Sequence, residues 1–329
     1  MELIKSSSFD EVSKVINDAL KLGSDNSLGY DYLVDFEKRF VKRVRNPITT
    51  GWRDIDEISK GGLGKGELGV VVAPTGAGKS MVLVHLGAQA LKEGKNVLHY
   101  TLELADTVVA GRYDSAITGV ELKNLVVFKE KIYDELREID GKLIIKEYPT
   151  RSASIQTIKN HVEKLKRRDF NPDMIIVDYG DLLKPENARK DEKRHQLETI
   201  YEELRGIAQI CECPLWTASQ TNRSGLNAEV ITMESISEAF NKCFVADLIF
   251  TVSRTVEDKN TNTGRIFVAK NRNGPDGLVY PIFMDTSNVK IKVLPQTGET
   301  MNDIIQKSSA ERLATLKEKY AAFKKEGGK

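Results

Sequence analysis

The stretch Val70–Met81, V-V-V-A-P-T-G-A-G-K-S-M, decides the fold of this chain. Three β-branched valines end at a turn that contains two glycines, and apolar residues then repeat at helical spacing: Val82, Leu83, Leu86 and Ala90. This order of strand, glycine loop and helix is the context of a phosphate-binding loop. The glycines let successive backbone N–H groups point into one hollow, and the helix N-terminus adds its positive dipole end. The stretch therefore predicts a site for a nucleoside triphosphate.

Individual residues of this loop have expected roles at the nucleotide. Lys79 would reach the β- and γ-phosphates, and the Ser80 hydroxyl would take one position on Mg²⁺. The cofactors that we expect are thus ATP, or another NTP, and Mg²⁺. A chance G-K-S in an ordinary βα turn is the alternative, and the flanking strand and helix patterns disfavour it. The residues expected to surround the nucleotide are Ala73, Pro74, Thr75, Gly76, Ala77, Gly78, Lys79, Ser80 and Met81.

The composition sets limits on the class of protein. With 329 residues, 40% of them hydrophobic, the chain can bury a large core, and its net charge of +1 argues against nucleic-acid binding through bulk positive charge. Three cysteines without a pairing pattern indicate a reducing compartment. We interpret Cys211 and Cys213 as buried thiols at a strand start rather than a metal pair. Since neither a signal peptide nor a long apolar span is found, we expect a cytoplasmic protein without membrane contact.

The chain divides into three parts by pattern. Residues 1–46 hold two amphipathic helical patterns, at Ser8–Leu22 and about Asp31–Val44, which could pack on their own domain or on a neighbouring subunit. Residues 47–297 carry the ATPase pattern, and residues 298–329 form a basic tail that is either helical or disordered.

The middle part alternates strands and helices. Continuous apolar runs in the strands predict an α/β fold with a doubly wound, mostly parallel sheet. Besides the phosphate-loop strand, we expect strands at Asn96–Leu102, Lys142–Glu147, Met174–Asp178, Pro214–Ser219, Leu248–Ser253, Arg265–Lys270 and Val279–Met284. We expect helices at about Val108–Ile139, Ile155–Arg168 and Gln196–Cys211.

Polar residues at the ends of three strands are candidates for the chemistry. Asp178 ends an I-I-V-D strand, where a carboxylate meets the Mg²⁺ of a phosphate-loop NTPase, usually through water. Glu103 could orient the attacking water or accept its proton, although a surface glutamate at a strand end is the commoner case. Gln220 could sense the γ-phosphate and pass its state to the loop that follows. Asp181 lies beyond its strand, and we interpret it as a loop or cap residue.

Lys270 and Arg272, in A-K-N-R-N-G-P, end a late strand. Their spacing places both side chains on the same side of an extended chain. They are poorly placed for their own phosphate loop but well placed to reach that of a neighbour, as an arginine finger does. A solvated basic turn is the alternative.

Two loops could contact nucleic acid. The segments 184–196 and 222–229 follow the strands that end in Asp178 and Gln220, and both supply groups that bind phosphate. Neither carries the interleaved aromatic residues of a base-stacking surface, so each taken alone is better read as a solvated loop. The candidate DNA contacts are Arg189, Lys190, Lys193, Arg194, Asn222, Arg223, Ser224 and Gly225.

Six motifs in order resemble those of the DnaB family of hexameric replicative helicases, whose cores are RecA-like, and of its T-even-type phage members in particular. The motifs are T-G-W-R-D-I-D with G-G-L-G-K-G-E-L, A-P-T-G-A-G-K-S, H-Y-T-L-E-L, I-I-V-D-Y-G-D-L-L, A-S-Q-T-N-R and A-K-N-R-N-G-P. Three further stretches match the phage members: Gly141–Thr150, Glu202–Ala208 and the Q-T-N-R-S-G stretch. The match runs from the N-terminal helices to about Leu294.

The resemblance implies a role for each candidate. Lys79 and Ser80 hold phosphates and Mg²⁺, Glu103 is the catalytic carboxylate and Asp178 supports the metal. Gln220 couples the γ-phosphate to DNA, while Lys270 and Arg272 act across the subunit interface. The N-terminal helices become a linker that docks on the adjacent subunit of a homo-hexameric ring, and the two loops line a channel around single-stranded DNA.

The resemblance also leaves other readings open. Primase, helicase loader and polymerase are possible partners. Family members usually carry an additional N-terminal domain before the linker, so contact with primase and a collar over the ring are in doubt here. The expected activity is NTP-driven unwinding of duplex DNA at a replication fork, in a bacterial or phage-infected cytoplasm. The alternatives are a RecA-like recombination ATPase that pairs DNA, and a RecA-fold signalling ATPase that uses no DNA.

Overall fold

The computed structural model describes residues 29–39, 45–185, 193–221, 230, 231 and 243–295. It separates into two compact units, residues 1–44 and 45–329. In the first unit the described residues form a turn followed by the short 3₁₀ helix η1 (Phe36–Arg39). The expected α-helix from about Asp31 is therefore not seen over the described part. The Asp31 carboxylate accepts hydrogen bonds from the backbone N–H groups of Leu33 and Val34, which compete with regular helical pairing.

The second unit is built on one sheet, which in the described residues has nine strands in the order β3-β2-β4-β5-β1-β6-β7-β8-β9. The first six in this order run parallel, and β7, β8 and β9 extend the sheet antiparallel. The strands are β1 (Leu68–Ala73), β2 (Val97–Thr101), β3 (Leu143–Glu147), β4 (Met174–Asp178), β5 (Leu215–Gln220), β6 (Leu248–Ser253), β7 (Thr263–Asn271), β8 (Val279–Asp285) and β9 (Lys290–Val293). The expected mostly parallel sheet is confirmed.

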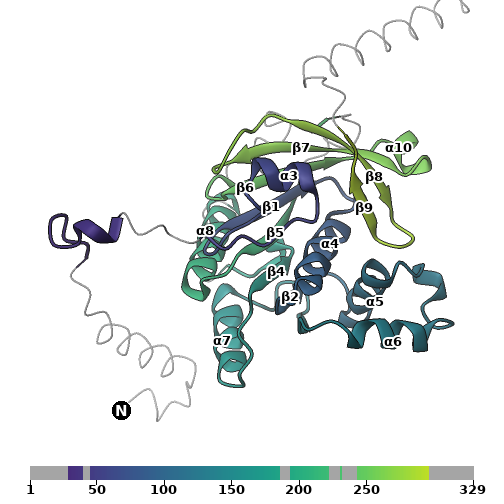
Figure 1. Ribbon diagram of the computed structural model, residues 1–329, viewed down its shortest axis with the longest axis horizontal. Helices are drawn as coiled ribbons and strands as arrows, with labels where there is room; N and C mark the ends of the chain where they lie inside the picture. The colour runs from purple at the N-terminus through teal and green to yellow at the C-terminus, as the bar shows by residue number, and fades with distance from the viewer. Residues whose placement is uncertain (1–28, 40–44, 186–192, 222–229, 232–242, 296–329) are drawn as a thin grey trace, which may run out of the picture. The chain divides into compact units, whose positions relative to one another are not determined.

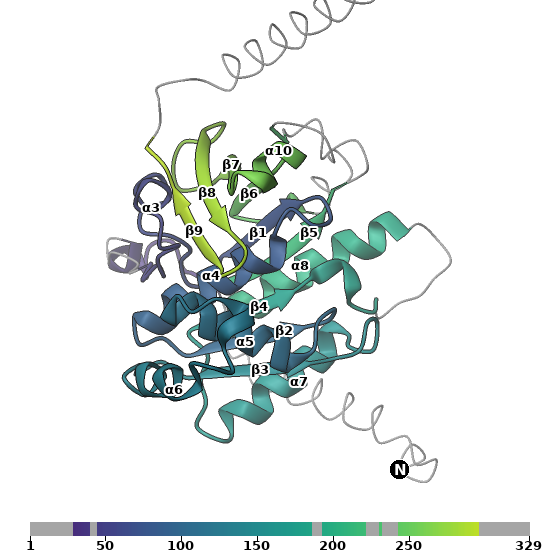
Figure 2. The same cartoon turned by 90° about the vertical axis from the view of Figure 1, so that its right-hand side faces the viewer.

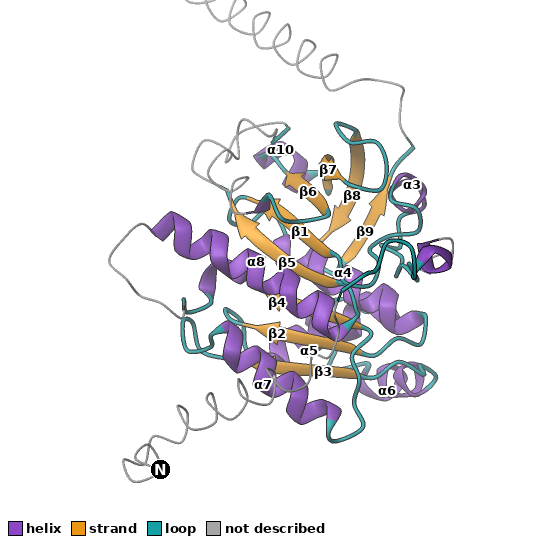
Figure 3. Ribbon diagram, turned by 90° about the vertical axis from the view of Figure 1, so that its left-hand side faces the viewer, coloured by secondary structure: helices purple, strands orange, loops and turns teal. Residues whose placement is uncertain are grey.

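Helices cover both faces of this sheet (Figures 1 and 3). On one face α4 (Lys79–Lys92) and α5 (Asp106–Thr118) pack with α3 (Arg53–Ile58) into one apolar core. On the other, α7 (Ile155–Lys166) and α8 (Lys193–Cys211) cover a second core. The parallel strands β1, β2, β4 and β6 are buried along their whole length, which explains their continuous apolar runs, whereas the outer strand β3 is only half-buried or exposed. Among the described helices, none is both long and apolar enough to cross a membrane.

The prediction of a single helix at about Val108–Ile139 is wrong. Gly119 adopts the left-handed conformation, with φ 74°, and ends α5, because glycine allows this helix stop without steric cost. The short η2 (Leu122–Asn124) and the helix α6 (Lys129–Arg137) follow as separate elements (Figure 2).

Other boundaries also differ from expectation. Pattern reading missed α3, α10 (Val256–Asn260) and β9, all of which are short. Lys193 and Arg194 were expected in a loop, but α8 already begins at Lys193. Cys213 is buried as expected, whereas Cys211 ends α8 and is only partly buried. The patterns at Ser8–Leu22 and in the C-terminal tail lie outside the described residues.

Candidate nucleotide and subunit-interface sites

The phosphate loop has the backbone that its glycines require. Gly76 and Gly78 have φ of 74° and 105°, and α4 begins directly after Gly78. A Cβ atom on Gly78 would lie 2.1 Å from Cε of Met284, so both its conformation and its surroundings favour glycine. Strand β1, the loop and α4 thus follow one another as the sequence predicts, and the loop opens at the carboxyl end of β1.

Lys79 is held inside this loop. Its Nζ donates a hydrogen bond of 3.3 Å to the Pro74 carbonyl and lies 5.8 Å from the ring centroid of Tyr179. Burial lowers the pKa of Lys79, and the charges of Asp178, Glu103 and Asp181 oppose that shift. The ammonium group therefore faces a group of carboxylates at the end of the loop.

Asp178 is a buried carboxylate with one unpaired oxygen. It ends β4 with 1% exposure, and Oδ1 has no hydrogen-bond partner. Burial raises its pKa to about 6, as does the charge of Glu103, while a hydrogen bond from Ser80 and the charges of Arg112 and Lys79 lower it. An unpaired buried oxygen next to a hydroxyl suits a hard cation that binds oxygen ligands. The donor set of Ser80 and Asp178 thus fits Mg²⁺.

The protein supplies only part of such a coordination shell. Among the described residues, no group of three or more His, Cys, Asp or Glu side chains could hold a metal ion on its own. Mg²⁺ in nucleotide sites commonly keeps several waters and phosphate oxygens as ligands. The donor set is therefore compatible with a metal that arrives with the nucleotide.

Glu103 lies beside Asp178 because β2 and β4 are paired. Thr101 is in register with Asp178, and the Leu102 N–H donates to the Asp178 carbonyl at 2.8 Å. The Thr150 hydroxyl holds the Leu102 carbonyl at 2.9 Å, which fixes the chain just before Glu103. Glu103 itself is exposed, and its charge acts on Lys79, Asp178 and Arg112. It is thus placed at the rim of the phosphate loop.

Gln220 contacts the phosphate loop directly. It is the last residue of β5, in register with Ala73, and its Nε2 donates a 2.6 Å hydrogen bond to the Thr75 hydroxyl. The Tyr179 hydroxyl donates to Gln220 Oε1 at 3.4 Å, and the Gln220 N–H donates to Asp181 Oδ2 at 3.4 Å. Gln220 therefore connects the loop to the chain that leaves β4.

Three residues near this site were not among the candidates. Arg112, the only basic residue of α5, interacts electrostatically with Asp178 and Glu103. Burial lowers its own pKa. Tyr179 contacts Gln220 and Lys79, and its place directly after Asp178 was an available signal. Asp181, interpreted as a loop residue, lies in η3 (Gly180–Leu182) and accepts a 2.8 Å hydrogen bond from Tyr201 of α8.

Lys270 and Arg272 lie at the opposite edge of the sheet. Arg272 Nη1 is 2.9 Å from Asp247 Oδ1, and the same carboxylate accepts the N–H of Leu68, the first residue of β1. The phosphate loop follows the other end of β1, which at about 3.3 Å per residue is roughly 16 Å away. Arg272 thus cannot reach the phosphate loop of its own chain.

The candidate DNA loops fall largely outside the described residues. Arg189, Lys190, Asn222, Arg223, Ser224 and Gly225 are all in that category. The described part of the chain before the first loop follows the carboxyl end of β4, and the described part before the second loop follows the carboxyl end of β5. Both loops thus begin on the same side of the sheet as the phosphate loop.

Comparisons with known proteins agree with this geometry. Residues 47–289 match the family described as DnaB-like helicase C terminal domain. The DnaB-like replicative helicase of Enterobacteria phage T4 is 31% identical over 260 residues, which cover 75% of this chain and 54% of that protein. The chain therefore spans about half the length of this curated relative.

Two solved structures share the fold. One is the structure of an ATPase domain, with a TM-score of 0.66 at 16% identity, over 83% of this chain and all of that one. A DnaB-like replicative helicase, solved in a study of its interactions with primase, has a TM-score of 0.69 at 15% identity, over 89% of this chain and 73% of that one. Both likenesses support the RecA-like fold.

Proposed function

Since this chain belongs to the DnaB-like helicase family, we propose that it is the NTP-hydrolysing motor of a ring helicase that moves along single-stranded DNA. Its activity in this proposal is the unwinding of duplex DNA at a replication fork, in the cytoplasm of a bacterial or phage-infected cell. The ligands are ATP or another NTP with Mg²⁺.

One observation carries this proposal. Lys79 and Arg272 lie at opposite edges of the same sheet, Lys79 at one end of β1 and Arg272 beside the other. If Arg272 takes part in hydrolysis, it must do so at the phosphate loop of a second copy, and a head-to-tail contact of this kind closes into a ring when its rotation allows. The opposed placement therefore supports an active site shared between neighbouring subunits.

The site residues divide the chemistry as follows. Lys79 and the loop N–H groups bind the phosphates, and Glu103 orients the attacking water and accepts its proton. Ser80 and Asp178 would hold Mg²⁺, which supplies charge stabilisation at the phosphates. Arg272 of the neighbouring subunit, with Lys270, stabilises the charge that develops at the γ-phosphate.

Gln220 couples this site to DNA in the proposal. Its hydrogen bond to Thr75 joins the phosphate loop to β5, which leads into the segment 222–229. Loss of the γ-phosphate would release Gln220 and change the position of that loop on the DNA backbone. The segment 184–196 follows Asp178 and Asp181 and would contact the same DNA strand.

The N-terminal part, residues 1–46, acts as the linker that docks on the adjacent subunit. A partner surface of suitable chemistry lies at α6 and the turn before it: Val126 and Val127 in the turn are 89% and 78% exposed, and Tyr133 in the helix is 63% exposed. Exposure of an apolar surface of this kind to water is unfavourable, and the apolar face of an amphipathic helix could cover it. Contact with primase, helicase loader or polymerase is a further part of the proposal, for which the basic tail 298–329 is the candidate segment.

A mixing experiment tests the shared site. Lys79→Ala subunits keep Arg272, and Arg272→Ala subunits keep an intact phosphate loop. Each variant alone should hydrolyse little ATP. In an equal mixture about a quarter of the contacts combine both intact halves, so activity should return toward about a quarter of wild type. Single-stranded DNA should stimulate that activity.

Two outcomes contradict the proposal. If Arg272→Ala keeps full activity, or if mixing restores none, the site is complete within one chain. If ATP hydrolysis is indifferent to DNA, the signalling ATPase gains support, and an open filament in electron microscopy favours the recombination ATPase.

A further inference from the structure

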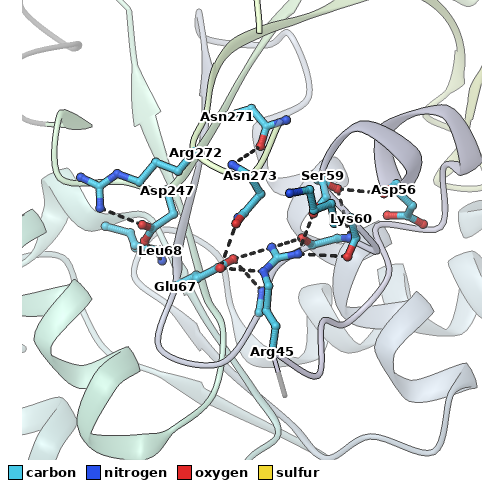
Figure 4. Close-up of polar contacts among 12 residues, drawn as sticks. Arg45, Asp56, Ser59, Lys60, Glu67, Leu68, Asp247, Asn271, Arg272 and Asn273 are labelled. Atoms are coloured by element: carbon cyan, nitrogen blue, oxygen red, sulfur yellow. Dashed lines mark hydrogen bonds and ion pairs between the residues drawn. The ribbon is translucent and has the colours of Figure 1, made fainter. Parts of the chain in front are cut away.

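A buried carboxylate organises the edge of the sheet at which Arg272 lies. Asp247, with 6% side-chain exposure, accepts hydrogen bonds from Arg272 Nη1 at 2.9 Å and from Arg205 Nη2 at 3.1 Å on Oδ1. Its Oδ2 accepts the Arg205 Nε at 3.2 Å and the Leu68 N–H at 3.0 Å. Both oxygens are therefore fully engaged, with the Arg272 contact drawn in Figure 4.

Asp247 also offsets the repulsion among three cations. Lys270 lies near Arg272 and Arg205; burial lowers its pKa most, those two charges lower it further, and Asp247 raises it. The Lys270 ammonium donates to the Phe244 carbonyl and lies 4.6 Å from the Phe244 ring centroid. Without Asp247 the like charges would push apart, since partly buried charges are weakly screened.

A second carboxylate, Glu67, holds the other side of the Arg272 loop. Asn273 Nδ2 donates to Glu67 Oε1 at 3.2 Å (Figure 4). Arg45 binds both oxygens of Glu67, with Nε at 2.7 Å and Nη2 at 2.6 Å, and the Gly64 N–H donates at 2.8 Å. Burial alone would raise the pKa of Glu67, but these hydrogen bonds and the Arg45 charge lower it.

Arg45 is itself fixed by backbone carbonyls. Its Nη1 donates to Ser59 and Lys60 at 2.6 and 3.0 Å, and its Nη2 donates to Gly62 at 2.6 Å (Figure 4). Because bidentate pairs with a guanidinium are directional, Glu67 has little freedom to move.

The backbone on both sides of Arg272 is closely packed. Asn271 Nδ2 donates to the Ile58 and Pro275 carbonyls at 2.9 and 3.0 Å. A Cβ on Gly274 would lie 2.1 Å from the Ile58 carbonyl oxygen, so the loop lies tightly on the end of α3. The Arg272 side chain, by contrast, is 42% exposed, and within the described residues only Nη1 of its guanidinium donates a hydrogen bond. The backbone around Arg272 and the Nη1 group of its guanidinium are therefore held, whereas its remaining guanidinium N–H groups donate no hydrogen bond within the described residues.

We propose that Asp247 and Glu67 are positioning residues for Arg272, one holding its guanidinium and the other its loop. This rests on the proposed function, in which Arg272 acts on the γ-phosphate of a neighbouring subunit. Catalytic charges are most effective when they are oriented before the reaction, because no reorganisation is then needed in the transition state. The two carboxylates supply this orientation to a long side chain that would otherwise sample many rotamers.

The test measures kcat and KM for ATP in the assembled full chain. Asp247→Asn weakens the ion pair with Arg272, and Asn273→Ala removes the bond to Glu67 while sparing the Glu67–Arg45 pair. We expect each to lower kcat about tenfold, with KM for ATP little changed, because a small misplacement of a catalytic group has effects of this size. Arg205→Gln is the matched control, since it removes the other cation from Asp247 but spares Arg272, and kcat should stay within about twofold.

Double variants separate positioning from general damage. Arg272→Ala should lower kcat about a thousandfold, and adding Asp247→Asn or Asn273→Ala to it should lower kcat no further. In mixtures with Arg272→Ala subunits, a Lys79→Ala/Asn273→Ala subunit should restore less activity than a Lys79→Ala subunit. Asn273→Ala keeps the buried ion pairs and thus remains informative if Asp247→Asn does not fold.

The alternative results are distinct. If Arg272→Ala is harmful but both positioning variants keep kcat, or if their effects add to that of Arg272→Ala, the inference is wrong and the proposed function stands. A rise of kcat in Asp247→Asn would show that Asp247 restrains Arg272, which also overturns the inference. If Arg272→Ala keeps full activity, the proposed function itself fails.

Discussion

The two edges of the sheet differ in how their charges are satisfied. At the carboxyl edge, Asp178 is buried with an unpaired oxygen and a pKa raised to about 6, and burial lowers the pKa of Lys79. At the opposite edge, Asp247 and Glu67 have hydrogen-bond donors on both oxygens. Unpaired buried charge costs stability and persists where a ligand is bound, whereas fully paired charge fixes geometry. The comparison indicates that one edge receives the nucleotide and the other presents a rigid cation.

The largest effect should come from the carboxyl edge. Glu103→Gln keeps the size of the side chain but cannot accept a proton, so we expect kcat to fall about 100- to 10,000-fold. ATP turnover with single-stranded DNA measures this, and nucleotide binding should survive.

Glu138→Gln is the matched control for that variant, because Glu138 is an exposed glutamate that follows α6 and lies outside the site. Full DNA-stimulated turnover in Glu103→Gln would contradict the role of Glu103 as proton acceptor. It would also weaken the assignment of the catalytic chemistry to the carboxyl edge.

The next effect concerns the apolar core between the edges. Burial lowers the pKa of His85 to about 4 and that of His99 to about 3, where Arg112 also contributes. Between these values and about 6.5 the unfolded chain binds more protons, so stability falls as the pH falls through that range. From pH 7 to pH 5 each histidine should cost about 2 kcal/mol.

Asp178 works in the opposite direction. Its pKa is higher in the folded state, so the folded chain binds more protons between about 3.8 and 6 and gains about 1 kcal/mol at pH 5. Urea unfolding at the two pH values measures the net loss. His85→Gln should remove about 2 kcal/mol of it. Equal stability at pH 5 and pH 7 would contradict the buried, neutral histidines.

A smaller effect should follow from Gln220→Ala. This change removes the hydrogen bond to Thr75 but leaves Lys79, Ser80 and Asp178 in place. We expect the ATPase rate without DNA to stay within about threefold, and its stimulation by single-stranded DNA to fall about tenfold. Stimulation that stays intact would show that another residue carries the signal from the carboxyl edge.

The smallest effect should come from Tyr179→Phe. The hydroxyl donates only a long 3.4 Å hydrogen bond to Gln220, while the ring that faces Lys79 is kept. We expect a change of about twofold or less in the DNA-stimulated rate. Tyr179→Ala removes the ring as well, and a larger loss there would assign the role of Tyr179 to its contact with Lys79.

The sequence by itself determined the parts that depend on local pattern. Val70–Met81 specified strand, loop and helix, because Gly76 and Gly78 adopt conformations that other residues avoid. The continuous apolar runs of β1 and β4 specified a buried parallel sheet, and this was confirmed. Short elements such as α3 and β9 were missed, because a few residues carry too little periodicity to be recognised.

Tertiary structure alone decided which residues meet. Pairing of β2 with β4 brought Glu103 beside Asp178, and the start of β6 brought Asp247 to Arg272 across 25 residues. The Glu67–Asn273 bond joins residues 206 apart. Contacts at such separations depend on strand order and register, which local propensity does not contain. The identities of the candidate residues were therefore readable in the sequence, whereas their division between two opposite edges required the fold.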